Sequence, residues 1–178
     1  TRLVMFCEDK ILRADTNKDL LFNADGNSQV VASNKVIGAA VPYTSRYGVS
    51  TNPESVVVTP SNMYFTDVMR GKVLALGNQG DGIRVISDKG MKDYFSDLFD
   101  SYVDECLGTF DARKKDYNLT VKKKYAHYQA APHESVTISY SESSDGWESF
   151  KSFIPQSGVS LNNSYYTMFD GMLFEHHI

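Results

Sequence analysis

The sequence of 178 residues is 42% hydrophobic and 22% charged, close to the average of globular proteins and long enough for one ordinary domain. Its 18 basic and 22 acidic residues give a net charge of −4, which argues against a general nucleic-acid-binding surface, so no nucleic-acid partner is expected. No apolar stretch approaches the roughly 18 residues of a membrane span, so no membrane insertion is expected. The 11 tyrosines and 10 phenylalanines favour β-strands.

The chain begins with neither an initiator methionine nor a basic-then-apolar signal pattern. Its first residues enter a strand pattern directly, so we expect a fragment of a longer protein that is made in the cytoplasm. Residues 1–178 are expected to form a single β-rich unit. Cys7 and Cys106 have no metal-binding or redox spacing and are interpreted as buried free thiols, with a single disulfide as the alternative.

A degenerate hairpin pattern recurs four times, each time as an aromatic strand end, an aspartate, a polar turn and a second apolar strand. The copies lie at residues 3–14, 63–76, 108–121 and 165–174, with equivalent phenylalanines at Phe6, Phe65, Phe110 and Phe169. These phenylalanines lie 59, 45 and 59 residues apart. Known propeller blades repeat more regularly, about every 40 to 50 residues. The pattern therefore predicts blade-like segments, with insertions, near residues 1–32, 55–106, 107–154 and 160–178.

Between the second and third copies the pattern changes from strand to helix. A turn at residues 77–82 leads into a strand at 83–86, and apolar residues at helical spacing then predict one amphipathic helix near residues 89–103. Asp88 is its predicted N-cap, and Gly108 is the residue predicted to stop it. The apolar face that we expect to cover the sheet comprises Met91, Tyr94, Phe95, Leu98, Phe99 and Tyr102.

Two further strands follow the third hairpin. Residues 135–140 alternate apolar and hydroxyl side chains and residues 147–153 return after a turn, so residues 108–153 are predicted to form one four-stranded antiparallel sheet. Residues 33–62, apart from a short strand at 55–58, and residues 123–134 are expected to be long loops. The predicted fold class is mainly β: antiparallel β-hairpins and four-stranded blade-like sheets in a partial β-propeller, with one amphipathic helix.

The sharpest metal-binding pattern is formed by Asp15, Asn17 and Asp19, which alternate as at the start of a calcium loop. The sixth position of that loop is Leu20 instead of glycine, and the twelfth is Gly26 instead of a bidentate glutamate. A polar turn is therefore the favoured interpretation, and a calcium site is the alternative. We expect no metal and no other cofactor.

Three aspartates, Asp67, Asp111 and Asp170, recur at equivalent positions of the hairpins. A glycosidase needs two carboxylates that face one cleft, but residues repeated at one position of several units more often share a structural task, such as capping turn amides. The segment Ser144-Asp145-Gly146-Trp147 is only weakly similar to the aspartate-box turns of sialidase propellers. We therefore expect no catalytic residues and no enzymatic activity, with a polysaccharide hydrolase as the least favoured alternative.

Other candidate binding residues have simpler structural interpretations. The glycines of residues 77–82 lack the Lys-Ser/Thr pair and the helix of a phosphate-binding loop, and the basic run at residues 122–124 is predicted to be a solvated loop. Neither zinc spacing nor a catalytic arrangement is found among the histidines, which are His127, His133, His176 and His177. Aromatic residues that would bind sugars or neighbouring subunits if exposed are Tyr43, Tyr47, Tyr125, Tyr128 and Tyr165.

A series of motifs runs through the chain in a fixed order. They are Asn52-Pro53-Glu54-Ser55, then residues 64–67 with 70–74, 86–95, 110–111 with 116–120, 146–155, and 162–167 with 170–171. Together they resemble large virion structural proteins of tailed bacteriophages, over nearly the whole chain. The resemblance implies a tail, nozzle (muzzle) or baseplate component with propeller-like blades, present in several copies around the tail axis, with no catalytic residues.

The favoured function is a structural component of a bacteriophage virion that is assembled in the host bacterial cytoplasm. It would act through interfaces with copies of itself and with other virion structural proteins. The alternative is a receptor- or glycan-binding propeller of a phage adhesion protein, with a host surface glycan as its ligand. The low cysteine content agrees with assembly in a reducing cytoplasm.

Overall fold

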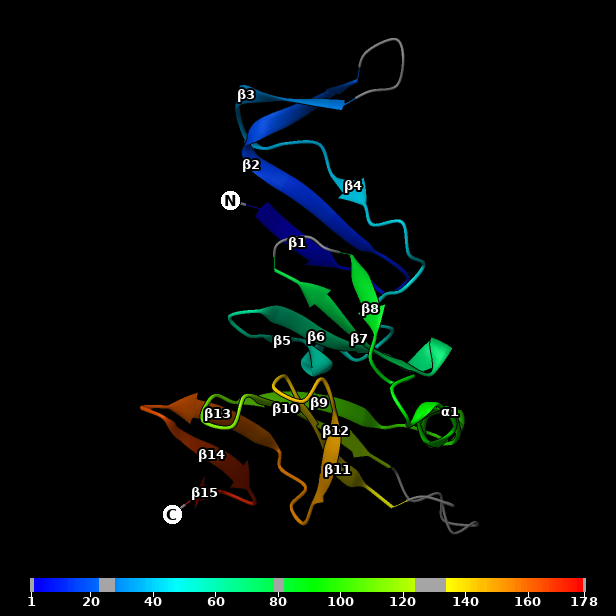
Figure 1. The fold of residues 1–178 in the computed structure, drawn as a ribbon, viewed down its shortest axis with the longest axis vertical. Helices are drawn as coiled ribbons and strands as arrows, with labels where there is room; N and C mark the ends of the chain where they lie inside the picture. The colour runs from blue at the N-terminus through cyan, green and yellow to red at the C-terminus, as the bar shows by residue number, and fades with distance from the viewer. Residues whose placement is uncertain (1, 23–27, 79–81, 124–133, 178) are drawn as a thin grey trace. The chain divides into compact units, whose positions relative to one another are not determined.

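Figure 1 shows the fold of a computed structural model, which describes residues 2–22, 28–78, 82–123 and 134–177. Strands make up 54% of the chain and helices 10%, so the predicted mainly-β class with antiparallel sheets and one α-helix is confirmed. The chain divides into two compact units, residues 1–48 and 49–178. No sheet closes on itself within the described ranges, and a propeller is therefore not confirmed.

The first unit consists of one antiparallel sheet. Its strands are β1 (Arg2–Phe6), β2 (Ile11–Phe22), β3 (Ser28–Ile37) and β4 (Val41–Pro42). The predicted first hairpin is β1–β2, with Phe6 opposite Ile11. Strand β2 continues past the predicted hairpin, which ended at residue 14, and pairs with both β3 and β4, with a change of register between Thr16 and Lys18. The predicted loop at residues 33–62 is thus wrong at its start, where β3 and β4 lie.

The second unit contains three antiparallel sheets in chain order. The first comprises β5 (Val57–Val58), β6 (Asn62–Asp67), β7 (Lys72–Gly77) and β8 (Ile83–Val85). The second comprises β9 (Glu105–Asp111), β10 (Asp116–Lys122), β11 (Val136–Ser141) and β12 (Gly146–Lys151). The third comprises β13 (Ser157–Leu161), β14 (Ser164–Phe169) and β15 (Met172–His176). The other predicted hairpins appear as β6–β7, β9–β10 and β14–β15, and the predicted four-stranded sheet is β9–β12.

The predicted helix is α1 (Lys92–Asp100), shorter than the residues 89–103 expected for it. Phe95, Leu98 and Phe99 are buried as predicted, but Tyr102 lies past the helix and is 68% exposed. Asp88 does not cap the helix, because the helix begins at Lys92 and Met91 occupies the N-cap position. The Asp88 carboxylate instead pairs with Lys72 at 2.6 Å. Among the described residues, no helix is both long enough and apolar enough to cross a membrane.

Gly108 does not stop the helix either, because it lies within β9. A Cβ atom at this position would stand 2.4 Å from the carbonyl oxygen of Ser55 and 2.7 Å from a methyl group of Val57. Ser55 ends the short 3-10 helix η1 (Pro53–Ser55) in front of β5. Glycine is therefore needed here for the close approach of β9 to the β5–β8 sheet.

The face of β9–β12 toward β5–β8 is apolar, and the two sheets share one core with α1. Tyr64 of β6 and Tyr117 of β10 stack at its centre, with ring centroids 4.7 Å apart. Around this pair the core contains Val73, Ala75, Ile86, Phe95, Leu98, Cys106, Leu119, Val121, Ile138 and Tyr140. Alternation along β10 and β11 places these apolar residues on one face and hydroxyl and amide residues on the other.

The opposite, polar face of β9–β12 is buried as well. Asn118 accepts a hydrogen bond from Ser139, and the hydroxyl groups of Thr120 and Thr137 lie 2.8 Å apart. At β9 this face meets β13, where a Cβ atom at Gly158 would lie 2.9 Å from a Thr109 methyl group. The β9–β12 sheet is thus the central layer of the second unit, with β5–β8 on its apolar face and β13–β15 on its polar face.

The substitution Gly108→Ala tests this packing, with Gly146→Ala as a control in the same sheet. A methyl group at Gly108 collides with backbone, whereas the nearest atom to a Cβ at Gly146 is 3.9 Å away. We expect Gly108→Ala to lower the free energy of unfolding by about 1–3 kcal/mol and Gly146→Ala to change it little. Urea unfolding followed by the fluorescence of Trp147, the single tryptophan, measures both. Equal effects would contradict the close approach.

Candidate functional site

The β13–β15 sheet combines two exposed apolar surfaces, which makes it the first candidate for a functional surface. In an antiparallel sheet, residues that pair across strands point to the same face. The register places Val159, Leu161, Met168 and Leu173 on the face away from β9–β12, which we call the outer face. All four are exposed, Leu173 by 63%. The same register also places Ser157, Ser164 and Glu175 on this face, but a face turned only to solvent would not carry four exposed apolar side chains among them.

The inner face of the same sheet is covered only in part. Beside β13, the Tyr165 hydroxyl lies 2.7 Å from the Thr109 hydroxyl, and the Ser160 hydroxyl donates to the carbonyl of Phe110 at 2.8 Å. Farther from β9, toward β15, Phe169 and Phe174 remain 50% and 43% exposed. These exposed rings belong to the second apolar surface.

This second surface lines a groove of about 500 Å³. One wall comes from the inner face of the sheet, with Phe169, Phe174 and His176. The other wall comes from Phe153, Ile154 and Pro155, which follow β12. The groove therefore lies between the end of the central sheet and the strand β15.

His176 is one of the polar residues that line the groove. Its ring packs on Phe153 and Tyr165, with centroids 4.6 Å and 5.1 Å away, and its Nε2 lies 2.8 Å from the hydroxyl of Thr167. Burial lowers the pKa of His176, and neighbouring His177 lowers it further, although Asp111 acts in the opposite direction. The structure therefore favours the neutral imidazole at this position.

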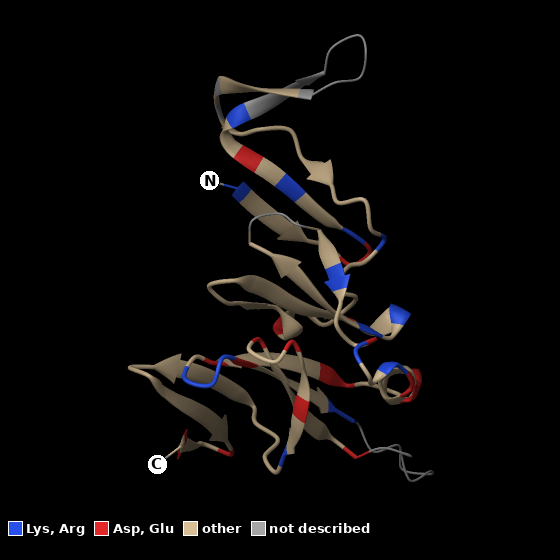
Figure 2. Ribbon diagram, viewed as in Figure 1, with Lys and Arg blue, Asp and Glu red and all other residues tan. Residues whose placement is uncertain are grey.

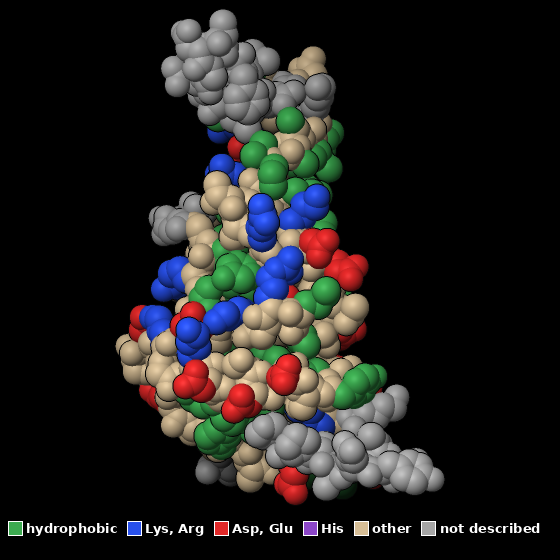
Figure 3. Space-filling view, turned by 90° about the vertical axis from the view of Figure 1, so that its right-hand side faces the viewer, with side chains coloured by type: hydrophobic (Ala, Val, Ile, Leu, Met, Phe, Trp, Pro, Cys, Tyr) green, Lys and Arg blue, Asp and Glu red, His purple; other side chains and the backbone are tan. Residues whose placement is uncertain are grey.

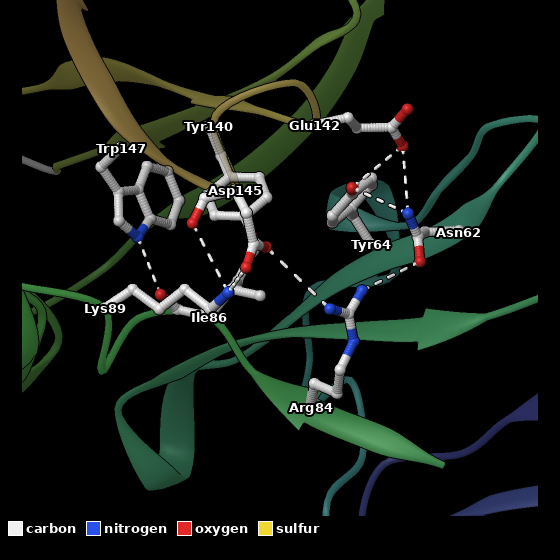
Figure 4. A network of polar contacts seen from close by, with 9 residues as sticks. All are labelled: Asn62, Tyr64, Arg84, Ile86, Lys89, Tyr140, Glu142, Asp145 and Trp147. Carbon is white, nitrogen blue, oxygen red and sulfur yellow. Dashed lines mark hydrogen bonds and ion pairs between the residues drawn. The ribbon is translucent and has the colours of Figure 1, made fainter. Parts of the chain in front are cut away.

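A second candidate is the polar network drawn in Figure 4, which joins β8 to the β11–β12 turn. Asp145, in that turn, pairs with Lys89 and accepts a hydrogen bond from Tyr140, and Arg84 of β8 lies 3.9 Å away. The hydrogen bond from Lys89, followed by that from Tyr140, lowers the pKa of Asp145. Trp147 donates to the carbonyl of Ile86 at 2.9 Å.

The other end of this network centres on Glu142. Its carboxylate accepts hydrogen bonds from Tyr64 at 2.9 Å, from Thr59 at 2.9 Å and from Asn62 at 3.2 Å. Burial, followed by the charge of Glu142, raises the pKa of Tyr64. Arg84 closes the network by donating to Asn62 at 3.1 Å. Every group in it has a partner in the chain, so we interpret the network as a clamp between the two sheets.

The charged side chains around the clamp are interspersed in sign. Figure 3 shows both blue and red side chains on the face turned to the viewer. Lys72 pairs with Asp88, and Arg70, in the 3-10 helix η2 (Val68–Arg70), pairs with Asp67 at 2.9 Å. This face therefore does not present the single-sign patch that binds a polyanion.

The repeated aspartates follow the structural interpretation at two positions. Asp67 accepts hydrogen bonds from the Arg70 amide at 3.2 Å and from the Ser50 hydroxyl at 2.8 Å. Asp111 accepts from the amides of residues 113 and 114 and lies 2.5 Å from His177. Asp170 lies in the β14–β15 turn with a φ of 49°. The three belong to turns of three different sheets, and the structure does not gather them in one cleft.

The calcium pattern does not form a loop. Asp15, Asn17 and Asp19 all lie within β2, where Asn17 adopts a φ of 57° at the change of register. Asp15 pairs with Arg2 at 3.4 Å. Both the polar turn and the calcium loop are therefore wrong, because the strand continues through a bulge. Within the described residues, no group of three or more acidic, histidine or cysteine side chains is placed to hold a metal.

The thiols and the basic run are partly as predicted. Both cysteines are free; Cys106 is buried, and burial raises the pKa of its thiol to about 12, but Cys7 is only half-buried. Lys122 lies in β10 and pairs with Glu105 at 2.8 Å. Lys123 is buried and donates to the carbonyl of Leu98 at the end of α1. A solvated loop was thus the wrong interpretation of these lysines, and Lys124 lies outside the described residues.

The remaining candidates are scattered. Of the aromatics considered for ligand binding, Tyr165 is buried and Tyr43, under Arg13, and Tyr47 are half-buried. In the glycine segment at residues 77–82, Gly77 ends β7, and residues 79–81 lie outside the described part of the chain. Candidates that lie outside the described residues are His127, His133, Tyr125 and Tyr128.

Sequence reasoning missed the two surfaces of the β13–β15 sheet. A signal was present, because Val159 and Leu161 alternate with Gly158 and Ser160, which is typical of a strand with one apolar face. The sequence did not show that the apolar face points away from the neighbouring sheet.

Compared with models of known protein families, the chain matches none, and a search of curated proteins finds no match.

A histidine substitution tests the environment of the groove. Because the folded state disfavours the charged form of His176, its contribution to stability is present above the unfolded pKa of about 6.5 and is lost as the pH falls below it. We expect the difference in unfolding free energy between the wild type and His176→Gln to shrink as the pH is lowered from about 7.5 to 5. Urea unfolding at several pH values measures the difference, and a constant gap would contradict the assignment.

Proposed function

We propose that the chain is a structural component of a tailed-bacteriophage virion that acts by forming interfaces with copies of itself and with other virion proteins. The observation that supports this most strongly is the outer face of the β13–β15 sheet, with four exposed apolar side chains from three adjacent strands. Contiguous exposed apolar surface on a folded protein usually marks a site of protein association.

The physical argument rests on how the second unit buries its other sheets. The central sheet is covered on both faces, but the β13–β15 sheet has a neighbour on its inner face alone among the described residues. Burying one exposed leucine or valine side chain contributes about 1.5–3 kcal/mol. A neighbouring subunit that covers the outer face would gain about half of such a term from each of Val159, Leu161, Met168 and Leu173, because these side chains are between 46% and 63% exposed.

The location in a phage tail, nozzle or baseplate rests on the sequence resemblance. The architecture is compatible with that proposal, because blade-like antiparallel sheets packed in series provide a stiff element without disulfides. A glycan receptor or a hydrolase is less well supported, because Asp67 and Asp111 bond to turn amides, Asp170 lies in another sheet, and Tyr165 is buried. Mass spectrometry of purified tailed-phage particles would check the location.

The association itself is tested by sedimentation velocity of the full chain at increasing concentration. We expect the wild type to associate and the double variant Leu161→Glu/Met168→Glu to remain monomeric, because each carboxylate would lose hydration in the interface. Met69→Glu is the matched control, because Met69 is 68% exposed in η2, outside this sheet.

Two results would count against the proposed interface. A wild-type chain that stays monomeric at every concentration would contradict association through this surface. An equal loss of association in Met69→Glu would show that the outer face has no special role. Circular dichroism of each variant shows whether it keeps the strand content of the wild type.

A further inference from the structure

Strand β15 forms an open edge of its sheet. Among the described residues it pairs with β14 alone, whereas both other sheets of the second unit have four strands. Phe169 and Met172 close a loop of two residues, Asp170 and Gly171, both at positive φ as in a type I′ turn. By the alternation of antiparallel pairing from this closing pair, we expect the backbone N–H and C=O groups of Leu173 and Glu175 to face the open edge.

The groove described above lies on the inner side of this edge. A strand added beside β15 would direct alternate side chains to the inner face of the sheet, toward the exposed ring of Phe174. The groove continues to Ile154 and Pro155, and its volume of about 500 Å³ can accept bulky apolar side chains. Edge and groove together have the two elements of strand addition: backbone hydrogen bonds and pockets for alternate residues.

The charge of the β13–β15 sheet favours one kind of strand at its open edge over another. Residues 155–177 include Asp170 and Glu175 and no lysine or arginine, and the strands β13–β15 are accordingly drawn without blue in Figure 2. Arg113 approaches the far end of β15, but its guanidinium donates to the carbonyl of His177 at 3.1 Å. A second copy of β15 would bring further carboxylates to this edge. A segment with basic residues would instead balance the negative charges of Asp170 and Glu175.

We propose that β15 accepts a basic, extended segment of another protein as the fourth strand of its sheet, with alternate apolar side chains of that segment in the groove. The inference rests on the proposed function, since both require that the chain works by binding protein. It adds the chemistry of one partner and assigns it to a surface distinct from the outer face.

A labelled peptide tests the inference on the full chain. The probe is a fluorescein-labelled synthetic peptide of alternating leucine and threonine with a lysine at each end, and binding is followed by fluorescence anisotropy. Leu173→Pro removes the N–H that faces the edge, a position where an edge strand tolerates proline, and Leu173→Ala is the matched control that keeps it. We expect Leu173→Pro to bind the peptide about tenfold more weakly than Leu173→Ala.

The groove is tested separately by Phe174→Ser, with Met69→Ser as its control. We expect a loss of about tenfold in affinity for Phe174→Ser and none for Met69→Ser. If Leu173→Pro fails to fold, a peptide N-methylated at alternate residues tests the same backbone bonds from the other side, and it should bind at least tenfold more weakly.

Several results would overturn the inference: no binding of the peptide, equal binding by Leu173→Pro and Leu173→Ala, or equal binding of a peptide with glutamate in place of lysine. Hydrogen exchange identifies other occupants. Amides of Leu173 and Glu175 that are protected at all concentrations would mean that the chain fills the edge itself. Protection that rises with concentration would mean a second copy. None of these results depends on the outer-face test, so the two proposals fail separately.

Discussion

The arrangement of the second unit depends on β9 being covered on both sides. Gly108 allows one face of the strand to approach η1 and β5, and Gly158 in β13 allows the other face to be approached at Thr109. Asn52 fixes the first contact by accepting a hydrogen bond from the Cys106 amide at 3.1 Å. A strand buried on both faces cannot shift its register without moving side chains of both kinds into the wrong layer.

The two junctions at the central sheet use different chemistry. Toward β5–β8 the contact is aromatic and aliphatic, with Tyr64 stacked on Tyr117, and the tyrosine hydroxyl groups reach Glu142 and the carbonyl of Ser55. Toward β13–β15 the contact consists of hydroxyl and amide groups, such as Thr109 with Tyr165. Apolar contact supplies most of the stabilisation, whereas directional hydrogen bonds specify one orientation of the third sheet.

Most strands could be predicted from the sequence, because alternation and turn residues are local signals. The features that were predicted wrongly depend on residues distant in the sequence. Asp88 is a residue type that often caps helices, but its carboxylate pairs with Lys72. Lys123 belongs to a basic run that favours an exposed loop, but its side chain is buried against the end of α1. Gly108 resembles a helix stop until β5 is known to lie against it. A calcium-like spacing cannot reveal that the strand continues through it.

The candidate surface shows the same limit. The alternation in β13 can be read from the sequence. Which face of the sheet meets a neighbour is instead decided by the contact between Tyr165 of β14 and Thr109 of β9, a strand about fifty residues earlier in the chain. The exposed groove likewise needs Phe153 and Ile154 to be placed opposite β15. Which apolar side chains of this chain are exposed therefore depends on how its sheets pack against one another, and no single sequence motif shows it.

The strand order of the second unit has a consequence for how such a chain arises and folds. Within each of its sheets every strand pairs with its neighbour in the sequence, so no pairing has to wait for a distant segment. Such local topology favours rapid, stepwise folding, one meander at a time as the ribosome releases it. The same locality lets each meander form its own strand pairs first, so the packing of one sheet on another, as in the core shared by Tyr64 and Tyr117, is the step that joins segments distant in the sequence.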